Sequence, residues 1–170
     1  IGNNKYQFTE ASNVEYVEIE NYGKIPVDYA NHPFLLFDKN GNFISAATVW
    51  STSSGTGALN DAVTAINSGE YADNTVIVLL REDYHISNGT YNTLGNLNGT
   101  LILDLGKNNM TTGTKPLFVA TGRNSAYTSN IEVKNGSITI DRALLGLGIA
   151  NANGYGQQFN VTFTDVNVGF

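Results

Sequence analysis

The stretch that decides the fold is Gly57–Ile86, GALNDAVTAINSGEYADNTVIVLLREDYHI. Its first part predicts a helix over Ala58–Asn67, with Thr56 as the N-cap and Gly69 as the stop. The apolar residues at helical spacing are Leu59, Ala62, Val63 and Ile66. Its second part, Asn74–Leu80 (NTVIVLL), is a continuous apolar run, which is typical of a strand covered on both faces. A single amphipathic helix buries one face, so we expect it to pack on the β-structure that follows.

Short apolar runs recur along the rest of the chain. Gly99–Leu105 (GTLILDL) repeats Asn74–Leu80 at an offset of 25 residues, and Val161–Phe170 repeats Ile131–Ile140 at an offset of 30. The matched pairs are Ile131 with Val161, Val133 with Phe163, Asn135 with Asp165, Ile138 with Val168 and Ile140 with Phe170. Short strands at a period of about 20–50 residues are typical of a solenoid, in which strands stack in parallel. We expect Asn135 and Asp165 at equivalent turns, where their side chains can bond neighbouring backbone.

Two further β-elements are expected before the helix. Asn13–Glu20 (NVEYVEIE) alternates with one slip, which predicts an exposed strand with three solvated Glu side chains. Pro33–Trp50 contains two apolar runs around Asp38–Asn42 (DKNGN), which predicts a β-hairpin. The alternate oxygens of that turn resemble a calcium loop, but the EF-hand pattern fails at its sixth and twelfth positions. Turn formation is therefore the favoured interpretation of these polar residues.

Composition limits the classes of function. The 170 residues carry a net charge of −6 and no Lys/Arg cluster, which argues against nucleic acid as a partner. No run is long and apolar enough to predict a transmembrane segment. The absence of Cys removes disulfides and thiol chemistry. The low charge content and frequent Asn, Gly and Thr favour β-strands joined by turns.

The segment GALNDAVTAI…TVIVLLREDYHI resembles the entry of pectin-lyase-like right-handed parallel β-helices, and Asn130–Ile138 (NIEVKNGSI) is similar to one of their coils. The resemblance covers about residues 57–170. It implies an all-β fold, a right-handed parallel β-helix with an N-terminal cap of a β-hairpin and one short α-helix. Residues 1–56 would form strands and part of the cap, and residues 57–170 one continuous domain. Members of this superfamily include polysaccharide lyases, glycoside hydrolases, phage tailspikes and bacterial adhesins, so the resemblance does not choose between functions.

The candidate site residues are few. Asp104 lies between Leu103 and Leu105, so it faces outward on its strand. The residues at its register in neighbouring strands are Leu79, Lys134 and Thr164, which argues against a pair of catalytic acids. The further strand acids are Asp141 and Asp165. His85 follows Glu82 and Asp83 and forms the best acid–base cluster. Tyr127 and Tyr155 lie in polar loops, where an aromatic ring can stack on a sugar.

The sequence and this resemblance therefore predict a non-catalytic, secreted or cell-surface module of bacterial type with a structural or adhesive role. Carbohydrate is its candidate ligand, and the candidate ligand-contacting residues are Tyr127, Tyr155, Asp104 and His85. The alternative is a carbohydrate-active enzyme, a polysaccharide lyase or glycoside hydrolase, or a fragment of one. No catalytic, cofactor-binding or metal-ligating residue is assigned; no cofactor is expected, and calcium stays open. The expected partners are a polysaccharide or a host or cell-surface molecule, together with end-to-end self-association.

Overall fold

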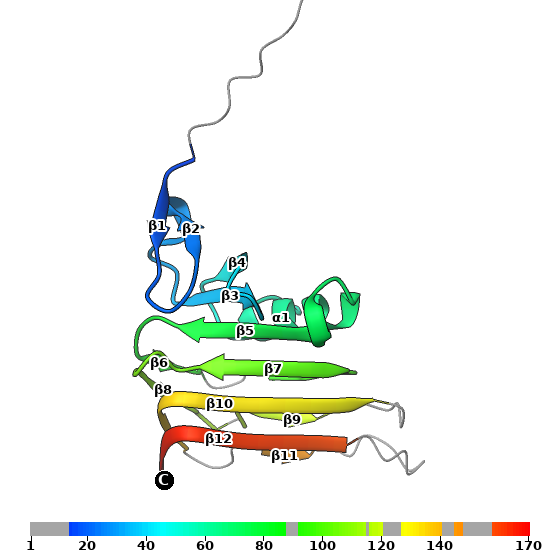
Figure 1. Cartoon of the computed structure of the whole chain (residues 1–170). Helices are drawn as coiled ribbons and strands as arrows, with labels where there is room; N and C mark the ends of the chain where they lie inside the picture. Colours follow the sequence, from blue (N-terminus) through cyan, green and yellow to red (C-terminus); the bar gives the residue numbers. More distant parts are fainter. Residues whose placement is uncertain (1–13, 88–91, 115, 121–126, 141–144, 148–157) are drawn as a thin grey trace, which may run out of the picture.

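The computed structural model describes residues 14–87, 92–114, 116–120, 127–140, 145–147 and 158–170, and most of this chain is a stack of β-strands (Figure 1). The helices are α1 (Ala58–Ser68) and two short 3-10 helices, η1 (Val27–Tyr29) and η2 (Ala72–Asn74). The strands are β1 (Tyr16–Glu18), β2 (Lys24–Pro26), β3 (Phe34–Asp38), β4 (Phe43–Ala47), β5 (Thr75–Leu80), β6 (Tyr84–His85), β7 (Gly99–Asp104), β8 (Asn109–Thr111), β9 (Phe118–Ala120), β10 (Thr128–Thr139), β11 (Leu145–Leu147) and β12 (Gln158–Gly169).

The main sheet is mixed. Its order is β4-β3-β5-β7-β10-β8-β6, with β12 paired to β10, while β1–β2 and β9–β11 form separate two-stranded sheets. The pairs β4–β3 and β3–β5 are antiparallel, whereas β5–β7, β7–β10 and β10–β12 are parallel. The prediction of an all-β, right-handed parallel β-helix is therefore wrong: the described strands form open sheets of mixed direction, not a closed solenoid.

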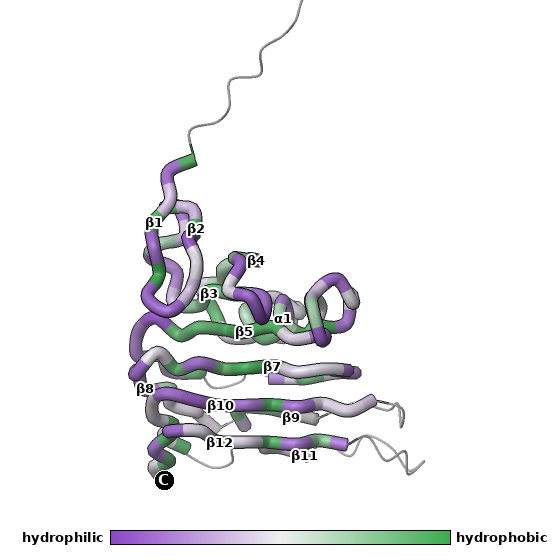
Figure 2. The backbone as a smooth tube through the Cα atoms, in the orientation of Figure 1, coloured by the Kyte–Doolittle hydropathy of each residue, from purple (hydrophilic) through white to green (hydrophobic). Residues whose placement is uncertain are grey.

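The physical reason for this error lies in β3. All four residues of Phe34–Phe37 are buried, so this strand needs cover on both faces and joins the main sheet beside β5. A continuous apolar run indicates two-sided burial, but it looks the same in sequence whether the neighbouring strand is parallel or antiparallel. Figure 2 shows this apolar character (green) continuing from β3 into β5.

The predicted repeat register is confirmed in the parallel strands. Val76 pairs with Leu101 at the offset of 25 residues, and Ile131 pairs with Val161 at the offset of 30. Leu101 in turn pairs with Ile131, so apolar side chains stack in columns from β5 to β12. The offsets are readable from sequence because a one-residue slip would move every apolar side chain to the opposite face.

The parallel strands bend. β10 pairs with β7 over Ser129–Lys134 and with β8 over Ser137–Thr139, so its two halves belong to different stretches of the sheet. Asn135 lies at the bend with φ 59°, in the left-handed region that Asn tolerates better than most residues. Asp165 occupies the equivalent bend of β12 with φ 54°, as the sequence predicts.

Helix α1 agrees with the predicted helix within one residue. Its buried residues are Ala58, Leu59, Ala62 and Ile66, and it packs against β5 and β7. Gly69 ends it in the left-handed conformation with φ 72°, as expected. The N-cap is Gly57, so the prediction of Thr56 is wrong by one residue. Glycine is required at residue 57 because a side chain there would collide with the Trp50 carbonyl oxygen.

Two apolar clusters lie on opposite faces of the sheet. The larger, which contains Trp50, Leu59, Val78, Leu103 and Val133, fills the space between α1 and the inner face of the strands. The smaller, which we call the outer cluster, consists of Ile19, Ile25, Leu35, Phe37, Ile77 and Leu79. The N-terminal β1–β2 hairpin supplies two members of the outer cluster and thereby covers the outer face of β3 and β5.

The predicted hairpin and the predicted N-terminal strand are both present. β3 and β4 pair antiparallel around the Asp38–Asn42 turn, and β1 lies within Asn13–Glu20. Glu15, Glu18 and Glu20 are exposed, as the alternation predicts.

Candidate functional site

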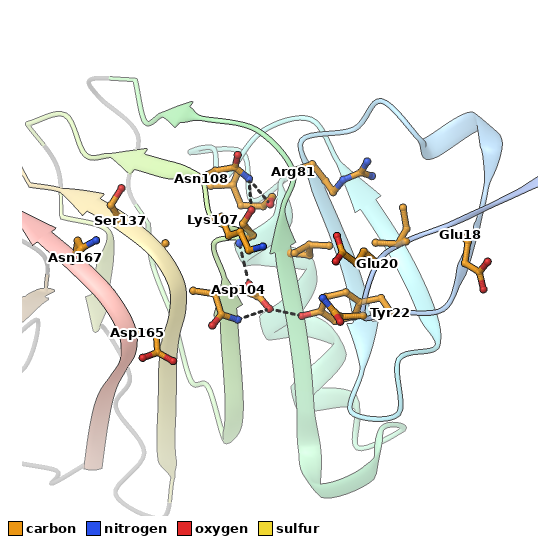
Figure 3. A pocket seen from close by; sticks show the side chains of 17 residues that line it. Glu18, Glu20, Tyr22, Arg81, Asp104, Lys107, Asn108, Ser137, Asp165 and Asn167 are labelled. Atoms are coloured by element: carbon orange, nitrogen blue, oxygen red, sulfur yellow. Dashed lines mark hydrogen bonds between the residues drawn. The ribbon is translucent and has the colours of Figure 1, made fainter.

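A groove of about 810 Å³ lies where the N-terminal segment Glu18–Tyr22 meets the bends of the stacked strands (Figure 3). The residues that line it are Glu18, Ile19, Glu20, Asn21, Tyr22, Leu79, Leu80, Arg81, Asp104, Gly106, Lys107, Asn108, Asn135, Gly136, Ser137, Asp165 and Asn167. Most carry carboxylates, amides or hydroxyls, and the apolar members are Ile19 and Leu79 of the outer cluster and Leu80 of the larger cluster. The groove is therefore a predominantly polar concave surface.

A hydrogen bond between Tyr22 and Asp104 joins the two sides of the groove. The Tyr22 hydroxyl donates to Asp104 Oδ2 at 2.7 Å, and the Tyr22 ring stacks on Phe37 with centroids 4.6 Å apart. Asp104 points away from the main core, as its position between two Leu residues predicts, yet it is only 6% exposed. Tyr22 therefore covers a carboxylate that the strand alternation alone would leave in water.

Asp104 has further partners on every side. Its Oδ1 accepts a hydrogen bond from the Gly106 N–H at 2.9 Å, and its Oδ2 accepts one from Asn135 Nδ2 at 3.2 Å. The Lys134 ammonium, on the strand beside it, lies 3.9 Å from Oδ2. A buried carboxylate with this many donors is well compensated for its lost hydration. Asp104 therefore connects the residues on both sides of the groove.

The pKa of the Tyr22 hydroxyl is raised far above its ordinary value. Burial is the largest cause, and the hydrogen bond and charge of the Asp104 carboxylate add to it. Both act in the same direction, because a phenolate would be poorly hydrated and would face a second negative charge. Tyr22 is therefore a neutral donor over the whole physiological pH range.

Four of the non-glycine residues that line the groove have a left-handed backbone: Asn21, Lys107, Asn135 and Asp165. Lys107 has φ 69° and Asn135 has φ 59°, and the Lys107 N–H donates to the Asn135 carbonyl at 2.6 Å. Asn108 fixes the same bend, because its side-chain amide donates to the carbonyl oxygens of Leu80, at 3.0 Å, and Gly106, at 3.2 Å. These hydrogen bonds connect successive bends to one another and fix the backbone that lines the groove.

The charges in the groove are mixed. Glu18, Glu20 and Asp165 are exposed carboxylates, whereas Arg81 and Lys107 are exposed cations. The Arg81 guanidinium donates to the Ala30 carbonyl at 3.4 Å. Such a mixture of donors and acceptors suits a polar, hydroxyl-bearing ligand better than an apolar one.

Of the three predicted ligand-contacting residues within the described ranges, Asp104 alone lines this groove. Asp104 lines it, but its oxygens are engaged as described. His85 is exposed on β6, apart from the groove, and the carboxylate of its neighbour Asp83 accepts a hydrogen bond from the Asn109 N–H at 2.8 Å. Tyr127 is half-buried and is not among the lining residues. Tyr155, like the candidate acid Asp141, lies outside the described residues.

The Asp38–Asn42 turn has the structure that turn chemistry predicts. Asp38 Oδ1 accepts the backbone N–H groups of Asn40 and Asn42, both at 2.8 Å, and Oδ2 accepts the Asn42 side-chain amide at 2.8 Å. Although partial burial raises the pKa of Asp38, these hydrogen bonds hold it below its ordinary value. Among the residues that the structure describes, no group of three or more His, Asp or Glu side chains is arranged to hold a metal ion.

Several residues that line the groove were not predicted from the sequence. Tyr22 lies in an irregular segment with no periodicity, so no local signal connects it to Asp104. The bends carried a weak signal, since Gly106 and Gly136 each lie two residues beyond the register pair of Asp104 and Lys134. Comparing those positions could have identified the groove floor, but not what covers it.

No protein-family model, curated protein or solved structure matches this chain. The resemblance of residues 57–170 to pectin-lyase-like proteins therefore stays a prediction. Within the described ranges, none of the helices has the length and hydrophobicity that crossing a lipid bilayer requires.

Proposed function

We propose that this chain is a non-catalytic, secreted or cell-surface module with a structural or adhesive role, and that it binds carbohydrate in the groove beside Tyr22. The observation that carries the proposal is the lining of that groove, in which amides, carboxylates and hydroxyls gather around a few apolar side chains. Sugar hydroxyls are both donors and acceptors, and amides and carboxylates supply the complementary groups. The volume of about 810 Å³ falls within the range of small-ligand sites.

The side chains nearest the solvent supply the expected contacts. Asp165 and Asn167 on β12 are exposed, Ser137 lies on the neighbouring strand, and all three line the groove (Figure 3). Their positions on hydrogen-bonded strands hold them at fixed spacing, and a rigid site loses little entropy when it binds. A carbohydrate would lie across these strands with the Glu18–Tyr22 segment along its side.

The environment of Asp104 supports a binding role over a catalytic one. A catalytic carboxylate must present an oxygen to the substrate, either as a nucleophile or as a proton donor. Both Asp104 oxygens accept hydrogen bonds from the protein, and the side chain is almost fully buried. Asp104 is therefore suited to positioning Tyr22 and the bend, not to acting on a glycosidic bond.

The test is a glycan-array screen of the purified chain, together with polysaccharide-degradation assays with and without calcium. We expect binding without turnover. Asn167→Ala should weaken binding by up to about tenfold, since one hydrogen bond contributes about 0.5–1.5 kcal/mol. The matched control is Asn160→Ala on the same strand, which is exposed but lies outside the groove.

Equal affinity losses in Asn167→Ala and Asn160→Ala would show that the groove is not the binding site. Turnover of any polysaccharide would overturn the non-catalytic role and favour the enzyme alternative. If the chain binds no glycan on the array, the carbohydrate-binding part of the proposal is wrong.

A further inference from the structure

Strand β12 has one unpaired edge. It pairs with β10 in parallel from Gln158 to Gly169, and none of the other described strands pairs with its opposite edge (Figure 1). An unpaired strand edge presents a row of free backbone donors and acceptors, which makes it a site for adding another strand.

The side chains of β12 are more exposed than their register partners on β10, which shows how much apolar surface stays uncovered at this edge. Val133 on β10 is 0% exposed, whereas its register partner Phe163 on β12 is 39% exposed. In the same way, Ile138 is 0% exposed and its partner Val168 is 40% exposed. The inner apolar side chains of β10 are fully buried because β12 covers them. Their register partners on β12 stay partly exposed. A further strand along this edge would cover them.

The edge also lacks the features that protect exposed strands. Proteins protect such edges with charged side chains, Pro or bulges. β12 (QFNVTFTDVNVG) contains no Lys, Arg or Pro, and its single charged residue is Asp165, at the bend. The straight half, Gln158–Thr164, is uncharged, so two copies of it meet no like-charge repulsion.

The backbone of the straight half is oriented for pairing with itself. The Gln158 N–H donates toward β10, to the Tyr127 carbonyl at 3.3 Å. Because backbone groups alternate along a strand, Phe159, Val161 and Phe163 direct their N–H and C=O groups to the open edge. These three residues are centred on Val161, so an antiparallel copy meets them in the same order.

We propose that two copies of this chain pair edge to edge through β12, antiparallel, with a two-fold axis at Val161. In this register Val161 lies opposite Val161 of the partner subunit, and Phe159 lies opposite Phe163 of the partner subunit. Outside, Asn160 lies opposite Thr162 of the partner subunit, so apolar side chains meet apolar ones and polar side chains meet polar ones. The arrangement is isologous, as a two-fold contact requires. It does not depend on what the groove binds.

The first test is sedimentation-velocity centrifugation of the full chain over a concentration series, which we expect to show a monomer–dimer equilibrium. Phe163→Lys should raise the dimer dissociation constant by about tenfold or more, because an unpaired ammonium among apolar side chains is strongly unfavourable. The matched control is Val168→Lys, on the same strand and equally exposed but beyond the paired segment. It should leave the dimer intact.

The second test fixes the register. The chain has no Cys, so Val161→Cys introduces a single thiol. In the proposed dimer the two Cα atoms of residue 161 are about 5.5 Å apart, within reach of a short bifunctional thiol reagent. Such a reagent should therefore cross-link Val161→Cys and leave Val168→Cys monomeric. A chain that stays monomeric at every concentration and does not cross-link, or a Val168→Lys variant that dissociates as Phe163→Lys does, would overturn the proposal.

Discussion

The hydrogen bond from Tyr22 to Asp104 can be removed almost alone by Tyr22→Phe. The substitution keeps the ring that stacks on Phe37 and removes the hydroxyl that donates to Asp104 Oδ2 at 2.7 Å. It leaves the Gly106 and Asn135 bonds to the carboxylate in place. The change in stability therefore reports how strongly the N-terminal segment is held to the stacked strands.

The expected cost is about 1.5 kcal/mol. Hydrogen bonds to charged groups contribute about 1.5–3 kcal/mol, and the lower end applies because Asp104 keeps its other donors. For a domain of this size, this cost lowers the melting temperature by about 3–6 °C. The native fold should survive, since the apolar contacts of the outer cluster are unchanged.

Urea unfolding followed by tryptophan emission measures this cost. Trp50 is the single Trp of the chain and is 1% exposed in the main core, so its emission shifts when the core opens. A far-UV circular dichroism curve with the same midpoint would establish that unfolding is two-state. The urea midpoint, with an unchanged slope, then gives the difference in free energy of unfolding.

The same variant changes how the free energy of unfolding depends on pH under alkaline conditions. The pKa of Tyr22 is higher in the folded chain than in the unfolded chain, so its contribution is fully present below about pH 10. Above that pH the unfolded state loses the proton first, and the stability of the wild-type protein falls. Tyr22→Phe lacks this loss, so the difference between the two proteins should shrink as the pH rises above 10.

The matched control is Tyr29→Phe, because the Tyr29 side chain is 37% exposed and lies on the same N-terminal part of the chain. It should change the free energy of unfolding by less than about 0.5 kcal/mol. If Tyr22→Phe unfolds at the wild-type urea midpoint and with the wild-type dependence on alkaline pH, the bond does not stabilise the docked segment and the reasoning fails.

Two further predictions concern the bends and the hairpin. Lys107→Gly should stabilise the chain by about 1 kcal/mol in urea unfolding, because glycine accepts the left-handed φ of 69° without the strain of a side chain, whereas Lys107→Ala should give no gain. Equal effects of both variants would show that the lysine charge, not the backbone, matters. Asp38→Ala should lower the melting temperature at neutral pH, and the gap to wild type should close as the pH falls through the depressed pKa of Asp38, since its bonds to Asn42 need the ionised carboxylate. A gap that stays constant down to low pH would contradict this assignment.

The local elements were predictable because each depends on residues close together in sequence. The helix was readable from one apolar stripe and Gly69, and the hairpin from the Asp38–Asn42 turn. The stacking offset was also readable, since matched apolar residues specify the strand register, as the pair of Ile131 and Val161 shows.

The candidate site was less predictable. His85 and Tyr127 were chosen by residue type and local neighbours, and neither lines the groove. Asp104 was correctly placed on the outer face by alternation, but its neighbours Tyr22 and Asn135 come from segments 82 and 31 residues away. A pattern of alternation gives the direction of a side chain and says nothing about which distant segment covers it.

The sequence by itself determined the helix, the hairpin turn, the longer strands and the register of the parallel stack, because these depend on local backbone preference and on the period of apolar side chains. The short strands β2, β6 and β8 were not predicted. Only the tertiary structure decided that β3 joins the main sheet antiparallel and that the N-terminal segment covers its outer face. The physical reason is that the hydrophobic effect is non-directional. An apolar strand face must be covered, but contacts between distant segments decide which segment covers it. That choice placed Tyr22 over Asp104 and so created the groove.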